Sequence, residues 1–162
     1  MTIARLMRLL VASALVGTPA WAGIVDSPPP GFGGDGAGVV VYRISPVYFE
    51  PGRVDTVVSC HNATGRSIPT ALEVFGDDDR PRGSVARAVA PAGGDVLFAT
   101  SAAAGLEHTS VVPGLVALPS GKARLSATSS ELSCSATHRI RSADGGLKEL
   151  AVELVKKVAP NR

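Results

Sequence analysis

Residues 132–140 read Leu-Ser-Cys-Ser-Ala-Thr-His-Arg-Ile, and this stretch decides the fold class. Cys134, Ala136, His138 and Ile140 occupy every second position, and polar residues fill all three places between them. Because successive side chains of a β-strand point to opposite faces, this spacing predicts a strand that covers a core on one side. An amphipathic helix would need apolar residues three and four positions apart.

The same alternation recurs along the chain. Leu72 and Val74 share one face of a second run, and Ala123, Leu125 and Ala127 share one face of a third. Pro-Gly, Ser-Gly and Asp-Gly-Gly sequences separate the runs, and these residues suit tight turns. We therefore expect an all-β fold, an antiparallel β-sandwich. Its nine predicted strands are residues 39–43, 54–60, 70–75, 84–89, 95–100, 115–118, 122–128, 132–140 and 147–155.

The last run, residues 147–158, fits two structures. Leu147, Leu150 and Leu154 have helical spacing, and charged residues would line the opposite side of such a helix. The Asp-Gly-Gly turn at 144–146 instead invites a hairpin, in which Leu150 and Leu154 share a strand face with Val152. We predict a strand and keep a short helix as the alternative.

Cys60 and Cys134 are the only two cysteines in the chain. Both lie on predicted strands, and cysteines of exported proteins mature where thiols oxidise. We expect them to form one disulfide that links the two sheets across the core. The alternative is a metal site made by Cys60 and His61 with His108 or His138, although structural zinc usually takes four ligands at close paired spacings.

Residues 1–22 have the pattern of an export signal. A start containing Arg5 and Arg8 precedes an apolar run at 9–16, and Ala20-Trp21-Ala22 ends the segment with small-x-small residues. The apolar run is much shorter than the ~20 residues that a membrane-spanning helix needs. We expect cleavage after Ala22 and a secreted or periplasmic protein that does not span the membrane once processed.

Charge gives little support for a nucleic-acid partner. Removing Arg5 and Arg8 from the 16 basic residues leaves 14, which equals the 14 acidic residues of the chain. Nucleic-acid binding depends on excess positive charge, so we expect none. A basic stripe would form only if the fourth and eighth predicted strands adjoined; its members would be Arg80, Arg82, Arg87, Arg139 and Arg141.

The mature chain divides into an arm and a domain. Residues 23–38 are rich in Gly and Pro and predict a flexible arm, because they have little to bury. Residues 39–158 form the predicted sandwich domain, and 159–162 form a tail. Val39, Val40, Val41 and Tyr42 at the junction make a candidate strand for addition to the sheet of an unidentified protein partner at the cell envelope.

Several short stretches carry a resemblance. The Cys60-His61-Asn62 sequence, residues 70–77, residues 127–129 and the Cys-Ser-Ala sequence at 134–136 are similar to small secreted bacterial β-sandwich proteins of uncharacterised function. A bridge from the second strand to the penultimate one also resembles the immunoglobulin clamp between sheets. The chain departs from immunoglobulin domains because its single Trp, Trp21, lies in the signal. The resemblance implies a β-sandwich and no activity.

Candidate chemical groups are few. His61, His108 and His138 are the histidines, and the common hydrolase, metalloprotease and nucleotide-binding motifs do not occur. Asp77-Asp78-Asp79 could hold Ca²⁺ or form a polar turn, and we favour the turn. We expect an exported, non-enzymatic binding or structural module of the cell envelope without a cofactor. The alternative is a small secreted hydrolase or metal-binding protein that uses one of the three histidines.

Overall fold

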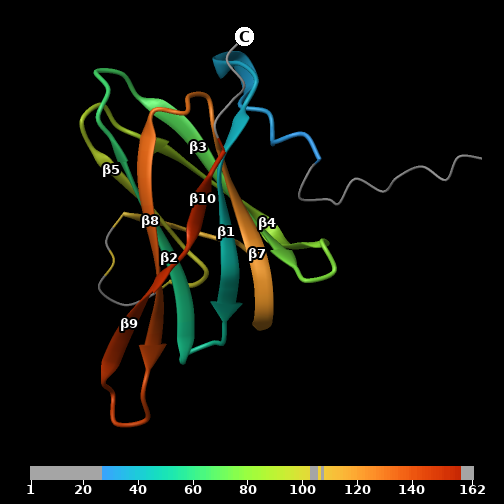
Figure 1. Cartoon of the computed structure of the whole chain (residues 1–162), viewed down its shortest axis with the longest axis vertical. Helices are drawn as coiled ribbons and strands as arrows, with labels where there is room; N and C mark the ends of the chain where they lie inside the picture. Colours follow the sequence, from blue (N-terminus) through green and yellow to red (C-terminus); the bar gives the residue numbers. More distant parts are fainter. Residues whose placement is uncertain (1–26, 103–105, 107, 158–162) are drawn as a thin grey trace, which may run out of the picture.

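The computed structural model describes residues 27–102, 106 and 108–157 (Figure 1). The predicted signal at 1–22 and the tail at 159–162 lie outside these residues. A short 3-10 turn, η2 (Gly33–Asp35), precedes the strands. The strands are β1 (Val39–Phe49), β2 (Val54–Asn62), β3 (Ile68–Gly76), β4 (Pro81–Ala90), β5 (Asp95–Ala99), β6 (Thr109–Val111), β7 (Leu118–Ala127), β8 (Leu132–Arg141), β9 (Leu147–Val152) and β10 (Leu154–Lys156).

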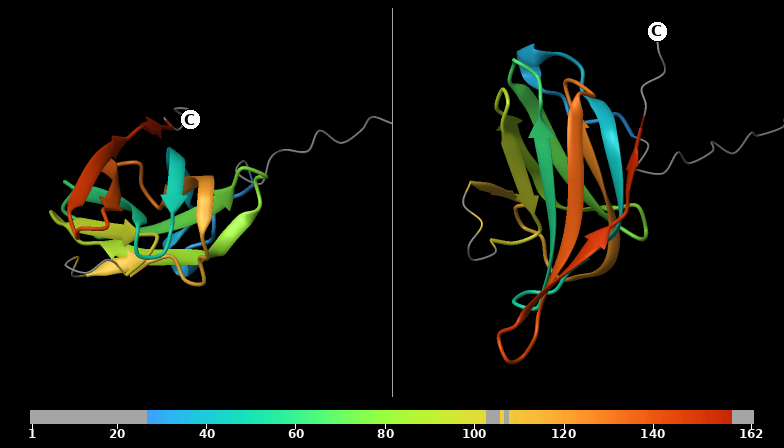
Figure 2. Two further views of the ribbon diagram at one scale, coloured as in Figure 1. Left: turned by 90° about the horizontal axis from the view of Figure 1, so that it is seen from below. Right: turned by 60° about the vertical axis from the view of Figure 1, so that its left-hand side comes forward.

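The strands form two five-stranded sheets that face each other (Figure 2). The first sheet has the order β10-β1-β7-β3-β4, and the second has the order β6-β5-β2-β8-β9. Neighbouring strands are antiparallel except β5 and β6, which are parallel. The predicted all-β sandwich is therefore confirmed. Among the described residues, no helix has the length and apolar character needed to cross a membrane.

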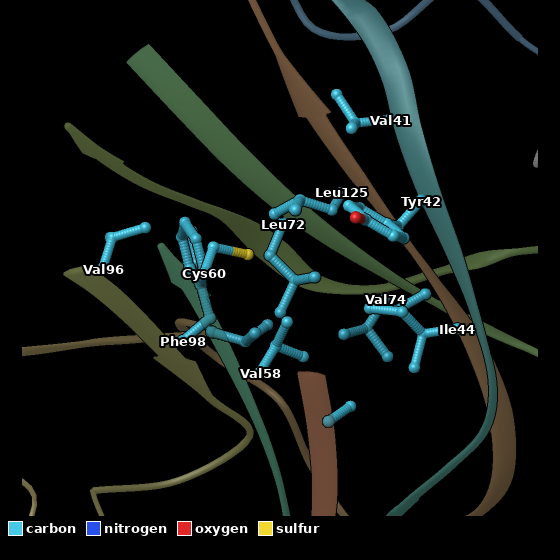
Figure 3. Packing of buried hydrophobic residues seen from close by; sticks show 14 of the residues in the cluster. Val41, Tyr42, Ile44, Val58, Cys60, Leu72, Val74, Val96, Phe98 and Leu125 are labelled. Carbon is cyan, nitrogen blue, oxygen red and sulfur yellow. The ribbon is translucent and has the colours of Figure 1, made fainter. Parts of the chain in front are cut away.

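The core lies between the sheets, as the alternation predicted. Ile44, Leu72 and Leu125 enter it from the first sheet, and Val58 and Phe98 enter it from the second (Figure 3). Each of these five side chains is at most 2% exposed. Burial of this apolar surface is the main favourable contribution to the stability of the sandwich.

The strand boundaries differ from prediction in several places. β1 continues to Phe49, six residues past the predicted end at Arg43. β7 runs unbroken through Ser120 and Gly121, where the Ser-Gly sequence indicated a turn. Residues 115–117 lie in a loop, and only Leu118 of that predicted run belongs to a strand. The short strand β6 was not predicted, because its three residues carry no alternating pattern. A run of apolar residues becomes a strand only where a partner strand is within hydrogen-bonding reach, and short runs do not specify such partners.

The C-terminal run is extended, which confirms the strand prediction. It divides at Glu153 into β9 in the second sheet and β10 in the first. Figure 1 shows the two strands, in red, crossing one side of the sandwich. One segment thus pairs with β8 and then with β1. The hairpin after β8 starts this path, because the turn returns the chain beside β8 as the Asp-Gly-Gly sequence indicated.

Cys60 and Cys134 form the predicted disulfide. They are direct partners in the register of β2 and β8, and their Cα atoms are 4.1 Å apart. The predicted position of the bridge between sheets is therefore wrong, because β2 and β8 are neighbours in the second sheet. Alternation predicted that both side chains face inward, but it does not say which strands are adjacent. The clamp on which the immunoglobulin resemblance rested is absent.

The first residues of the described chain lie against the first sheet. Arg124 donates hydrogen bonds to the carbonyls of Ser27 and Pro28, and Arg87 donates one to the carbonyl of Gly31. The predicted flexibility of the arm stays a prediction. The part of the arm that the structure describes, from residue 27 onward, forms these hydrogen bonds with the sheet.

Val39–Tyr42 is not a free strand in this structure. Val39, Val40 and Tyr42 pair with β7, and Tyr42 also pairs with Lys156 of β10. One edge of the proposed adding strand is therefore occupied by β7 of the same sheet. The basic stripe is also not formed, because β4 and β8 belong to different sheets.

Candidate functional site

A pocket of about 540 Å³ opens at the end of the sandwich where β1 and β8 finish and β7 begins. We call this the open end. The lining is mainly apolar and comes from both sheets. The lining residues are Tyr48, Phe49, Glu50, Val54, Ala117, Leu118, Pro119, His138, Ile140 and Leu150. Small-molecule sites in proteins have this size and this kind of lining.

His138 is the polar residue most deeply placed in this lining, at 7% exposure. Its Nδ1 atom lies 3.1 Å from the hydroxyl oxygen of Thr56, its partner across β2 and β8. The Thr56 hydroxyl donates to the carbonyl of Tyr48 at 2.8 Å and accepts from the Tyr48 amide at 3.0 Å. The Tyr48 and His138 rings are tilted against each other with centroids 4.9 Å apart.

These contacts assign the proton on the His138 ring. The single hydroxyl hydrogen of Thr56 is used by Tyr48, so Nδ1 of His138 must be the donor to Thr56. In the neutral ring, Nε2 is then an acceptor. This Nε2 atom is buried and has no hydrogen-bond partner among the described residues. Burial lowers the pKa of His138 and thereby favours the neutral ring with its free acceptor.

Apolar side chains are exposed around the mouth of this pocket. Leu150 of β9 is both a lining residue and 40% exposed, and Val116 in the adjoining loop is 73% exposed. Glu50 provides a carboxylate among the lining residues. Exposed apolar residues grouped around a concave site are typical of binding surfaces, since scattered single residues would not form such a group.

His61 lies at the other end of β2 and faces outward. Its Nδ1 atom is 2.8 Å from a carboxylate oxygen of Asp95, and both side chains are about half exposed or more. Asp95 and Ser133 are its direct partners on the two neighbouring strands. Ser133, His61 and Asp95 thus form a row across three strands, although no hydrogen bond joins Ser133 to His61 in the described structure.

The structure does not bring the three histidines together. His61 and His138 pair with positions five residues apart on β2 and β8, so they are separated by roughly 16 Å along the strands. His108 is exposed in the loop before β6, with a left-handed φ of 56°. Cys60 cannot serve as a thiolate ligand, because its sulfur is in the disulfide. Within the described ranges, no three His, Cys, Asp or Glu side chains are grouped to hold a metal ion.

The acidic cluster has the contacts of a turn. Asp78 pairs with Arg82 at 2.9 Å, Asp79 pairs with Lys122 at 3.1 Å, and Asp77 accepts a hydrogen bond from Ser120 at 3.2 Å. The three carboxylates therefore engage three different partners.

Comparisons with models of protein families, with curated proteins and with solved structures find no match to this chain. The open-end pocket must therefore be interpreted from its own residues. The sequence singles out His138 but does not predict the pocket, because lining residues such as Tyr48, Leu118 and Leu150 come from distant positions. Alternation at His138 was the one available signal, since it placed a polar ring on a core-facing position.

Proposed function

We propose that this protein is an exported, non-enzymatic binding module and that the open-end pocket is its ligand site. The observation that carries the proposal is the mainly apolar pocket of about 540 Å³ between the sheets, with exposed apolar residues at its mouth. The disulfide supports a setting outside the reducing cytosol, because such bonds persist mainly in oxidising compartments.

The lining indicates the class of ligand. Phe49, Leu118 and Ile140 offer an apolar surface, and the buried Nε2 of His138 offers one acceptor that has no partner within the described part of the chain. An unsatisfied buried acceptor is costly, so a ligand that supplies a donor gains affinity there. We propose a small molecule with an apolar ring body and one hydroxyl or N–H donor.

A matched ligand pair tests this proposal. We expect 2-naphthol to bind more tightly than 2-methylnaphthalene, which has nearly the same shape but no donor. Binding is followed by NMR shifts of the amides of β8 and β9. Leu150→Asp should abolish these shifts, whereas Leu147→Asp should keep them, because Leu147 is exposed on the same strand but does not line the pocket. Equal loss in both variants, or no localised shifts, would contradict the proposal.

Export has its own test. The chain is expressed with residues 1–22 in a bacterial host, and the N-terminus of the periplasmic protein is sequenced. We expect the protein to begin at Gly23 and to contain no free thiol. Retention in the cytoplasm with an intact N-terminus would contradict the export part of the proposal and leave the pocket test unaffected.

A second candidate function is ester hydrolysis at the row of Ser133, His61 and Asp95. The specific observation is that Asp95 contacts Nδ1 of His61, while Ser133 is the next residue across the sheet. An acid that orients a histidine beside a hydroxyl is the arrangement of a Ser-His-Asp triad. In this hypothesis His61 takes the proton of Ser133 as the Ser133 oxygen attacks the ester carbonyl. The bond between the acyl carbon and the alcohol oxygen then breaks, the alcohol leaves with the proton from His61, and water releases the acid from Ser133.

Hydrolysis of 4-nitrophenyl acetate distinguishes the two candidates. If the row is catalytic, His61→Ala and Ser133→Ala should each reduce the rate at least ~100-fold, because the two residues would act as one unit. Ser135→Ala is the matched control, since Ser135 lies two positions along the same strand and also faces outward. A parent rate equal to that of either variant would remove this candidate.

A further inference from the structure

The outward face of the first sheet carries a group of polar and aromatic side chains, of which Phe75, Arg124 and Ser126 are buried. Ala123, Leu125 and Ala127 of β7 face the core, so Arg124 and Ser126 face away from it. Arg124 is nevertheless only 2% exposed. We call this surface the outer cradle, and its residues are Glu73, Phe75, Arg87, Arg124 and Ser126.

Arg124 is held rigidly at the centre of the outer cradle. Its Nε donates to Glu73 at 2.6 Å and its Nη2 donates to the other carboxylate oxygen at 3.1 Å. Its guanidinium carbon lies 5.2 Å from the centre of the Phe75 ring. An arginine fixed by two hydrogen bonds and one ring contact presents its remaining donors in a defined direction.

Those donors contact the backbone of the arm. Arg124 donates through Nη1 to the carbonyl of Ser27 at 2.5 Å and through Nη2 to that of Pro28 at 3.1 Å. Arg87 donates to the carbonyl of Gly31 at 2.9 Å, and its guanidinium lies 5.8 Å from the Phe32 ring. The outer cradle thus recognises three carbonyls and one aromatic ring along six residues.

A proline-rich segment suits this recognition. The three consecutive prolines at 28–30 have no amide hydrogen. The surface that binds this segment therefore needs to offer few hydrogen-bond acceptors. Their fixed φ keeps the segment extended and lowers the entropy lost on binding. The arginine donors match its carbonyls. Ser126 also fits a binding face, because its hydroxyl is fully buried without a hydrogen-bond partner in the described structure.

The connection between the arm and β1 is rich in glycine. Residues 33–38 include Gly33 and Gly36 with φ of 68° and 97°, values that other residues rarely adopt. Moving the arm to a neighbouring molecule would preserve every contact with the outer cradle and change only this glycine-rich connection. We propose that the outer cradle is a docking site for a proline-rich segment and that residues 27–32 of a second copy occupy it in an arm-exchanged dimer.

Mixing two isotopic forms of the chain that starts at Gly23 tests this proposal. Unlabelled and ¹⁵N-labelled protein are combined, and native mass spectrometry counts mixed dimers. We expect their fraction to rise with protein concentration. An excess of a synthetic peptide of residues 27–34 should convert them to monomers, and a scrambled peptide should not. A monomer at every concentration would overturn the proposal, as would a dimer that resists the peptide.

Two variants and one control locate the contact. Phe32→Ala removes the ring from the arm, and Arg87→Ala removes its partner from the outer cradle; each should reduce the mixed-dimer fraction severalfold. Arg66→Ala is the control, because Arg66 is an exposed arginine paired with Glu131 away from the arm. Circular dichroism checks that each variant is folded. A dimer fraction unchanged in both folded variants, or reduced equally by the control, would overturn the assignment. This proposal concerns a different face from the pocket, so either can fail alone.

Discussion

The two ends of the sandwich satisfy their buried polar groups differently. At one end, which we call the closed end, Asn62 is fully buried, and its side-chain nitrogen and oxygen both have hydrogen-bond partners. At the open end, Nε2 of His138 is buried and has no hydrogen-bond partner in the ranges that the structure describes. Both residues lie on the long strands of the second sheet. The difference fits the proposal that the open end binds a ligand, because a buried acceptor there has no partner among the described residues, whereas the buried amide of the closed end is fully engaged within the fold.

The closed end is held by several independent contacts. The two N–H groups of the Asn62 amide are shared among the carbonyls of Arg66, Ala90 and Pro91, at 2.7 to 3.1 Å from the nitrogen. Its side-chain oxygen accepts from the amide and the hydroxyl of Thr64 at 3.0 and 2.7 Å. The Tyr42 hydroxyl donates to the carbonyl of Leu132 at 3.0 Å and thereby joins the first sheet to the second. The disulfide lies beside this contact.

Breaking the disulfide should produce the largest loss at the closed end. The bond connects residues 74 positions apart, and the loop it closes restricts the unfolded chain. We expect Cys60→Ala and Cys134→Ala each to lower the free energy of unfolding by about 4 kcal/mol, and the double variant to lower it little further. Urea unfolding measures all three. Losses that add in the double variant would contradict a single shared bond.

Removing the Asn62 amide should have the next largest effect. Asn62→Ala removes the two N–H groups that three carbonyls share, and we expect the free energy of unfolding to fall by about 3 kcal/mol. Ser67→Ala, an exposed change in the same loop, serves as the control and should stay within about 0.5 kcal/mol of the parent. A small effect of Asn62→Ala would show that the two ends differ less than proposed.

At the open end, the expected effect appears as a pH dependence. Because the folded pKa of His138 is lowered, the unfolded chain binds a proton at higher pH than the folded one. The neutral His138 ring therefore makes its full contribution to stability above about pH 6.5, the ordinary pKa of histidine. This contribution is lost as the pH falls through the folded value. Thermal unfolding across this range should show the loss in the parent and a flatter profile in His138→Leu, and identical profiles would refute it.

The smallest effect is expected away from both ends, in the acidic turn. Asp78→Ala removes exposed ion pairs with Arg80 and Arg82, and such pairs contribute little. We expect a change within about 0.5 kcal/mol of the parent in urea unfolding. Melting with and without added Ca²⁺ is the companion measurement. A rise in the parent that is lost in the variant would indicate a calcium site instead.

The sequence predicted features that depend on local periodicity. Alternation in 132–140 gave a strand with Cys134 and His138 on the inner face, and the structure agrees. Which strands are neighbours depends on how the whole chain folds and not on local periodicity. The sequence therefore did not reveal that Cys60 and Cys134 lie on adjacent strands of one sheet. The pocket was missed for the same reason, because Tyr48 and His138 meet only after β1 and β8 are stacked.

The path of the last two strands has a consequence for biosynthesis. β8 and β1 are exposed edges of their respective sheets until residues 147–156 arrive, since this one segment pairs with both. Unpaired edges recruit other chains. A chain in which residues 147–156 have not yet been synthesised would therefore expose two unpaired strands, β1 and β8, to association with other chains. Synthesis of this one segment covers both.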